Sequence, residues 1–176
     1  MLVDGINYRT IKPNKELSCV EIIDQTALPF EFVIKRLETL ADVIESIISM
    51  RVRGAPLIGV SAAYGIALAM NTDTSNHSLE ACKKLLINSR PTAVNLSWAV
   101  NLSYKALVET GESDRIEKAW EIANNLAEED VDKNKLIGTH GFGLLKRHGS
   151  TINILTHCNA GWLATIDHGT ALSPIY

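Results

Sequence analysis

Cys158 is the residue whose type and setting most directly suggest chemistry. It lies in His157-Cys158-Asn159-Ala160-Gly161, a predicted tight turn that follows the apolar run Ile152 to Thr156. If that run is a strand of a parallel sheet, Cys158 stands at its carboxyl end, where α/β folds place reacting groups. A thiol near the start of a helix is also more easily deprotonated, and His157 could add positive charge. The alternative is a buried, unreactive cysteine.

Two arginines stand just before predicted helix starts, where an anion could bind. Arg53-Gly54-Ala55-Pro56 combines a guanidinium, a glycine and the unpaired N–H groups of a helix start, which together suit a phosphate. Arg90-Pro91-Thr92 repeats the arrangement, with an arginine directly before a proline that can begin a helix. Each arginine taken alone could simply pack against its own helix. The two together favour an anionic ligand.

Three other patterns do not predict a site. The run Gly138-Thr139-His140-Gly141-Phe142-Gly143 lies in a helical pattern and follows no strand, so we expect it to serve close helix packing rather than phosphate binding. His140, His148 and His168 have no partners at the spacing of metal ligands, so we predict no metal site. Asp167 precedes His168 directly, and adjacency in sequence does not make a catalytic pair.

Composition and charge exclude several classes of protein. The chain has 176 residues, 46% of them hydrophobic and 21% charged, and a formal net charge of −3. This balance argues against the basic surface of a nucleic-acid binder and against a polybasic membrane arm. No apolar run approaches the roughly 20 residues that span a bilayer. Three cysteines without CxxC spacing argue against a disulfide framework, and we see no secretion signal, so we expect a cytoplasmic protein with unreactive Cys19 and Cys82.

The elements that would position these residues form a helix-rich region with a small sheet. Cys19 to Ile23 and Phe32 to Ile34 predict two strands. Thr39 predicts the N-cap of a helix that runs to about Met50. Apolar periodicity predicts further helices at about 57–70, 79–88, 90–110 and 116–127, with apolar residues resuming through 145. The small residues of 57–70 suit a central helix against which neighbours pack closely.

The character of the sequence changes at Lys146 to Gly149. Ile152 to Thr156 predicts a strand buried on both faces of a parallel sheet, and a helix could begin at Trp162. We therefore predict an α/β (α+β) fold with a helical N-terminal domain over residues 1–149 and the start of a second, α/β domain over residues 150–176. One strand and one helix cannot close a parallel sheet.

Six stretches of the chain together carry a family resemblance. They are Asp24-Gln-Thr-Ala-Leu-Pro29, Val52-Arg-Gly-Ala-Pro-Leu-Ile-Gly59, Ala63-Tyr-Gly65, Arg90-Pro-Thr-Ala-Val-Asn-Leu96, Ile154-Leu-Thr-His-Cys-Asn-Ala-Gly161 and Gly169-Thr-Ala-Leu172. With them the chain resembles the N-terminal half of the S-methyl-5-thioribose-1-phosphate isomerases of methionine salvage, in the superfamily of the translation initiation factor 2B alpha, beta and delta subunits. The resemblance implies that residues 150–176 begin a truncated Rossmann-like domain.

The resemblance also implies a reaction and a set of roles. Such enzymes convert 5-methylthioribose 1-phosphate, a phosphosugar, into 5-methylthioribulose 1-phosphate as homodimers, without a metal or other cofactor. By resemblance, Arg53, Gly54, Ala55 and Arg90 bind the substrate, mainly its phosphate, and Cys158 stands at the reacting carbons. The family's aspartate proton donor, a glutamine and an Asn-Lys pair belong to its second half and have no counterparts here. Asp167-His168 also departs from the family, which usually has a glycine and an aromatic residue there.

Three other interpretations stay open. The chain could be a non-catalytic regulatory subunit of the same superfamily, or it could act on ribose 1,5-bisphosphate. It could also be a degenerate fragment whose strand at 152–156 leaves an exposed sheet edge that favours aggregation. The cysteine and the two arginines favour the isomerase branch.

Overall fold

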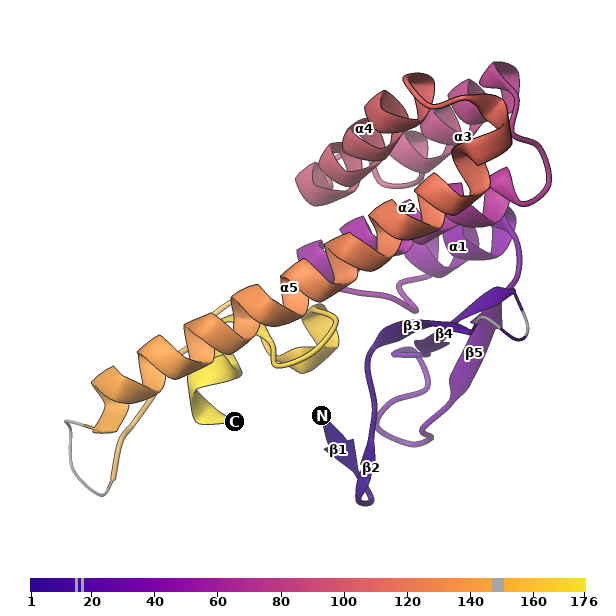
Figure 1. Cartoon of the computed structure of the whole chain (residues 1–176). Coiled ribbons are helices and arrows are strands. Elements are labelled where there is room, and N and C mark those ends of the chain that lie inside the picture. The colour runs from indigo at the N-terminus through magenta and orange to yellow at the C-terminus, as the bar shows by residue number, and fades with distance from the viewer. Residues whose placement is uncertain (15, 17, 147–150) are drawn as a thin grey trace.

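A computed structural model of the chain describes residues 1–14, 16, 18–146 and 151–176, and shows a mixed α/β, helix-rich protein (Figure 1). The strands are β1 (Leu2–Val3), β2 (Ile6–Asn7), β3 (Ile11–Asn14), β4 (Cys19–Ile23) and β5 (Ile34–Leu37). The helices are α1 (Leu40–Ile48), α2 (Ala55–Met70), α3 (Asn76–Ser89), α4 (Val94–Val108) and α5 (Arg115–Leu145), with short 3-10 helices η1 (Glu112–Asp114), η3 (Trp162–Ala164) and η4 (Thr170–Ile175). None of the described helices has the length and apolarity needed to span a bilayer.

The small sheet has the antiparallel order β3-β4-β5, with β4 in the centre. The strand predicted at Cys19 to Ile23 is confirmed as β4. The strand predicted at Phe32 to Ile34 is shifted, because pairing with β4 begins only at Ile34, opposite Ile23. Phe32 instead packs edge-on against the ring of Tyr8, with the ring centroids 4.8 Å apart.

Helix α2 is the centre of the helical layer, and α1, α3, α4 and α5 pack around it (Figure 1). Its residues from Leu57 to Met70 are all buried. Small residues permit this position: an added Cβ at Gly59 would lie 3.0 Å from the backbone oxygen of Asn95 in α4. The prediction of a central small-residue helix is confirmed. So is the Thr39 N-cap of α1, where the amide of Asp42 donates to the Thr39 hydroxyl.

Helix α5 is a single helix that projects beyond the helical layer at its C-terminal end (Figure 1). The charged stretch near residue 130 does not interrupt it, because those side chains pair along the helix surface, as Lys133 does with Glu129 at 3.0 Å. The predicted close packing of its glycines is confirmed at two of three positions. Added Cβ atoms at Gly138 and Gly141 would meet η4, whereas Gly143 has no neighbour within 4 Å.

The strand predicted at Ile152 to Thr156 is wrong. Residues 151–157 are irregular and exposed, and the side chain of Leu155 is 98% exposed. A strand is stabilised by hydrogen bonds to a neighbouring strand, and in the part of the chain that the structure describes none lies beside this segment. The helix predicted from Trp162 is replaced by the short η3 and η4. The predicted domain boundary between 149 and 150 lies outside the described residues, and the division into two domains stays a prediction.

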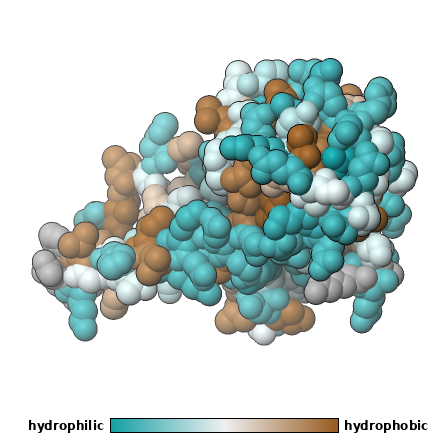
Figure 2. All heavy atoms as spheres, turned by 45° about the horizontal axis from the view of Figure 1, so that its top comes forward, coloured by the Kyte–Doolittle hydropathy of each residue, from teal (hydrophilic) through white to brown (hydrophobic). Residues whose placement is uncertain are grey.

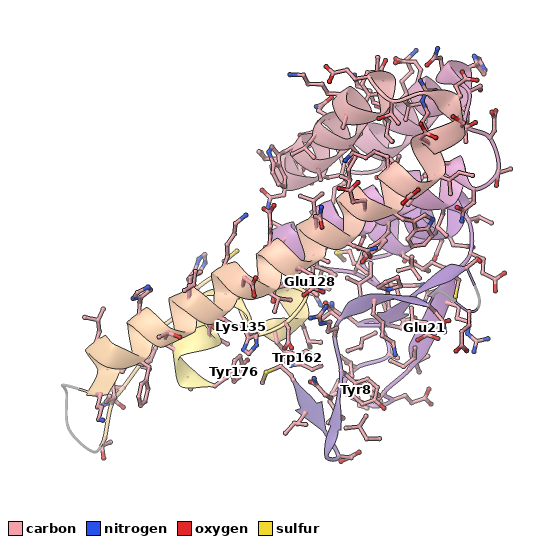
Figure 3. All side chains as sticks on the ribbon, viewed as in Figure 1. Tyr8, Glu21, Glu128, Lys135, Trp162 and Tyr176 are labelled. Carbon is pink, nitrogen blue, oxygen red and sulfur yellow. The ribbon has the colours of Figure 1, made fainter. Side chains whose placement is uncertain are left out.

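Residues after 160 fold back onto the N-terminal sheet and α5. The backbone amide of Thr10 donates to the Ile166 carbonyl at 3.1 Å, and the Ser173 hydroxyl donates to the Asn134 carbonyl at 2.6 Å. Trp162 and Tyr176 therefore lie beside the part of α5 that carries Glu128 and Lys135 (Figure 3). These contacts fix the residues that immediately follow the turn at Cys158.

Candidate active site

Five residues singled out in the sequence line one cleft of about 640 Å³. They come from three separate parts of the chain: Arg53, Gly54 and Ala55 from the start of α2, Arg90 from the end of α3, and Cys158 from the turn before η3. Residues more than 100 positions apart in sequence thus share one cavity.

The start of α2 presents backbone N–H groups toward this cleft. The first N–H groups of a helix lack intrahelical partners, and Gly54, the N-cap, offers no side chain to cap them; Pro56 has no N–H, so the free donors belong to its neighbours. Gly54 has a φ of +93°, and an added Cβ would lie 2.4 Å from the backbone of Ala164. Only glycine allows both this conformation and this approach. The helix start, with its partial positive charge, therefore stays open to an anion.

The loop that carries Arg53 is held from behind by Arg51. The Arg51 guanidinium pairs with Asp24 and, at 3.2 Å, with Glu45, while its carbonyl accepts the amide of Gln25 at 3.0 Å. Burial by itself would raise the pKa of Asp24, but hydrogen bonds from Thr26 and from Arg51 outweigh it and lower the pKa. The carboxylate form of Asp24 is thus favoured, which keeps Arg51 in place and leaves Arg53 to face the cleft.

Arg90 reaches the cleft from a turn, and not from a proline-started helix as predicted. The amide of Ala93 donates to the Arg90 carbonyl at 3.0 Å, which closes a turn over residues 90–93. Helix α4 consequently begins at Val94, with Ala93 as its N-cap. The predicted helix start is wrong by four residues, yet Arg90 still lines the same cleft as Arg53.

Cys158 is exposed, whereas Cys19 and Cys82 are buried, as expected for unreactive structural cysteines. Cys158 does not lie at the end of a strand; it sits in a turn with a φ of +77°, and its carbonyl accepts the amide of Ala160 at 3.1 Å. Downstream, the side-chain amide of Gln25 donates to the Leu163 carbonyl at 2.7 Å. The turn is therefore fixed by the same segment, Asp24 and Gln25, that holds the loop of Arg53.

The charge of the cleft is positive in a chain whose net charge is −3. Its described lining contains Arg53, Arg90 and His157 but no aspartate or glutamate. Such a lining attracts anions and repels cations. Among the described lining residues, Cys158 carries a thiol and His157 an imidazole, side-chain groups that can act in proton transfer. No three His, Cys, Asp or Glu side chains among the described residues lie close enough together to hold a metal ion.

Residues 51–175 match the sequence profile of the Initiation factor 2 subunit family. The chain belongs to this family.

Curated relatives in this family carry the name methylthioribose-1-phosphate isomerase. The Rhodospirillum centenum relative is 51% identical and the Escherichia coli O45:K1 relative 50% identical, each over the whole of this chain and 48% and 49% of the relative, respectively. The chain therefore spans about half the length of the curated relatives it matches. The family resemblance drawn from the sequence motifs is confirmed.

Two solved structures of the family share the fold. One is the translation initiation factor eIF-2B subunit delta from A. fulgidus, with a TM-score of 0.84 and 34% identity over 96% of this chain and 50% of that one. The other is the 5-methylthioribose 1-phosphate isomerase from Pyrococcus horikoshii, with a TM-score of 0.82 and 36% identity over 95% of this chain and 48% of that one.

Met50 lines the cleft and was missed by the reasoning from sequence. It follows the end of α1 with a φ of +60°, a left-handed conformation that usually calls for glycine. The break at Arg51 signalled the helix end but not this conformation. Asp167 and His168 do not line the cleft; Asp167 accepts a hydrogen bond from the Met1 ammonium group at 2.8 Å. Their adjacency in sequence does not reflect a catalytic pair in this cleft.

Proposed function

We propose that this chain forms the phosphosugar-binding part of an aldose–ketose isomerase that converts 5-methylthioribose 1-phosphate into 5-methylthioribulose 1-phosphate. The single observation that carries the proposal is the convergence of Arg53, Arg90 and Cys158 on one positively charged cleft. The printed names of relatives that are 47–51% identical over the whole chain support the same reaction.

The phosphate is the group that the described residues are best suited to bind. Two guanidinium groups can each donate paired hydrogen bonds to phosphate oxygens, and the N–H groups at the start of α2 can add more. In this proposal Arg53 and Arg90 hold the phosphate, and Gly54 keeps the backbone of Ala55 accessible to it. The phosphate on the anomeric oxygen prevents the sugar from opening to a free aldehyde in solution. The enzyme that binds the phosphate must therefore also promote ring opening.

Cys158 is then the group at the reacting carbons. The ring oxygen must gain a proton, and a hydrogen must pass from C2 to C1, either as a proton through an enediol-like species or as a hydride. A thiol can carry a proton between neighbouring carbons or stabilise the transition state. No carboxyl group lines the described cleft, so we assign the protonation of the ring oxygen to a residue outside it.

We also infer the location and the assembly of the protein: it is cytoplasmic and works as a homodimer on a small phosphosugar. The regulatory alternative finds support in the fold of the eIF-2B subunit delta neighbour, but it gives no role to an exposed cysteine beside two arginines.

A chimera tests the proposed reaction. Residues 1–176 replace the aligned half of the Rhodospirillum centenum relative, and the conversion of 5-methylthioribose 1-phosphate to the ketose is measured. We expect activity that falls by about 100-fold or more with Cys158→Ala, because a positioned proton-transfer group typically contributes 10²–10⁴-fold. Cys82→Ala, in α3 and outside the cleft, serves as the control and should retain activity. A folded chimera without activity, or one that tolerates Cys158→Ala, contradicts the proposal.

A further inference from the structure

The loop between the Cys158 turn and η4 is closed at its base. Gly161 ends the turn and Gly169 precedes η4, and a Cβ added to Gly169 would collide with the backbone of Gly161. Gly169 has a φ of +71°, which glycine adopts without strain. Both ends of the loop reach the cleft, since Ala160 and Thr170 line it together with Cys158. A contact that holds this loop thus bears on where the Cys158 turn lies.

The loop is bound by Asp130 of α5 at Ile166. One oxygen of the Asp130 carboxylate accepts the backbone amide of Ile166 at 2.9 Å. The other oxygen accepts the side-chain amide of Asn134, one turn further along α5, at 3.2 Å. The orientation of the carboxylate is therefore fixed from both sides. Asp130 does not line the cleft, so its effect on the cleft must pass through the loop.

The same face of α5 also holds η4, which follows the loop. The Ser173 hydroxyl of η4 donates to the Asn134 carbonyl at 2.6 Å. Further along the helix, Gly138 and Gly141 have no side chains and so leave room for Ser173 and Pro174. One face of α5 therefore binds both the loop and the element that begins at its end.

Past these glycines α5 is largely uncovered. Phe142 and Leu144 are 57% and 60% exposed, and Figure 2 shows apolar atoms open to solvent at this projecting end of the molecule. The hydrogen bonds and close contacts given above thus belong to the part of α5 from Asp130 to Gly141, nearer the cleft.

The Asp130 carboxyl is costly to bury, which favours a specific role for it. Burial raises the pKa of this carboxyl, and the hydrogen bond from Ile166 and the charge of Lys133 offset only part of the rise. An apolar side chain would avoid the cost of burying a charge. It could not accept the amide of Ile166, however, and a buried N–H without a partner is itself unfavourable. The loop would then have to shift to satisfy that amide.

We propose that Asp130 is a positioning residue, which holds the loop through Ile166 and so keeps Cys158 in the cleft beside the bound phosphosugar. The loop lies between two elements, because Ala164, two residues before Ile166, packs on Gly54 at the start of α2. Asp130 therefore sets the distance between the cysteine turn and the anion-binding helix start. The inference rests on the proposed function, because it takes the ligand to be bound in this cleft.

Alkylation of the cysteines by iodoacetamide, located by mass spectrometry, tests this role in the chain itself. Cys158 is exposed and should react, whereas Cys19 and Cys82 are buried and should not. In the wild type, 5-methylthioribose 1-phosphate should slow the alkylation of Cys158 by about tenfold or more, because a ligand at about 100 times its Kd leaves only about 1% of the sites free. Asp130→Ala should still bind the ligand in titration calorimetry, because both arginines are unaltered, but should lose most of this protection. Cys19 and Cys82 should stay unreactive in the variant, since the change is confined to the loop.

Two further variants separate the hydrogen bond from charge and from general stability. Asp130→Asn keeps an oxygen that can accept the Ile166 amide, so it should keep the protection. Asp132→Ala removes an exposed carboxyl of the same helix and should behave as the wild type.

Several results would contradict the positioning role and leave the proposed function intact. They are full protection of Cys158 in Asp130→Ala, loss of protection in Asp130→Asn, and alkylation of the two buried cysteines in Asp130→Ala, which would indicate a general loss of stability. A wild-type chain that binds the ligand without protecting Cys158 also contradicts the role, while phosphosugar binding stands. A wild-type chain that does not bind the ligand contradicts the proposed function, and the positioning role with it.

Discussion

Gly54 is the residue at which the start of α2 packs against the segment that follows the Cys158 turn. Its positive φ starts α2 at the required angle, and the space left by its missing side chain is filled by the backbone of Ala164. Ala164 lies in η3, just after the turn that carries Cys158. The start of α2 and the cysteine turn are therefore packed against each other at a point where no side chain fits.

Gly54→Ala should lower the free energy of unfolding by about 1–3 kcal/mol. The new methyl group would lie 2.4 Å from the backbone of Ala164, and alanine is strained at a φ of +93°. Gly143→Ala is the matched control, and it should raise the free energy of unfolding. Gly143 lies inside α5 with no neighbour within 4 Å, so alanine should stabilise the helix by about 0.5–1 kcal/mol. Urea denaturation of both variants measures the difference. Equal effects at the two positions would refute the packing role of Gly54.

At the scale of the elements, ion pairs hold the loop between α1 and α2 in position. Arg51 is held between Asp24, which follows β4, and Glu45, which lies in α1. Because hydrogen bonds from Thr26 and Arg51 lower the pKa of Asp24 despite its burial, the folded state binds a proton there less readily than the unfolded chain does. The stabilisation by this carboxylate is complete above the unfolded pKa of about 3.9 and is lost as the pH falls through the lower folded value.

Asp24→Asn should therefore lower the free energy of unfolding at neutral pH by about 1–3 kcal/mol, the range for hydrogen bonds to charged groups. It should also reduce the loss of stability that the wild type shows on acidification below about pH 4. Urea denaturation at a series of pH values measures both effects. Glu109→Gln, an exposed carboxyl at the end of α4, is the control. A pH profile unchanged by Asp24→Asn would show that the ion pair does not stabilise this loop.

At the scale of the whole molecule, the cleft depends on contacts between distant segments. Thr10 and Gln25 of the N-terminal part bind the carbonyls of Ile166 and Leu163, and α5 packs against η4. The site is thus a product of the tertiary fold and not of any single motif.

Local patterns predicted the helices and β4 well, because capping at Thr39 and apolar periodicity act within a few residues. They failed where the answer depends on distant neighbours. The apolar run Ile152 to Thr156 has the composition of a buried strand, but without a strand beside it the segment is irregular. The left-handed conformation of Met50 is a different case, because it belongs to the local ending of α1, where no glycine marks it in the sequence. Arg53, Gly54, Ala55, Arg90 and Cys158 were predictable from motifs and the family resemblance, whereas Met50 and the shape of the cleft required the structure.

Equilibrium binding of 5-methylthioribose 1-phosphate to the wild-type chain and to arginine variants tests the central claim most directly. Arg53→Gln and Arg90→Gln should each weaken binding by about tenfold or more, because each removes a charged donor to the phosphate. Arg36→Gln, an exposed arginine of β5 outside the cleft, should leave binding unchanged. If the ligand binds all four proteins equally, or binds none of them, the cleft is not a phosphosugar site.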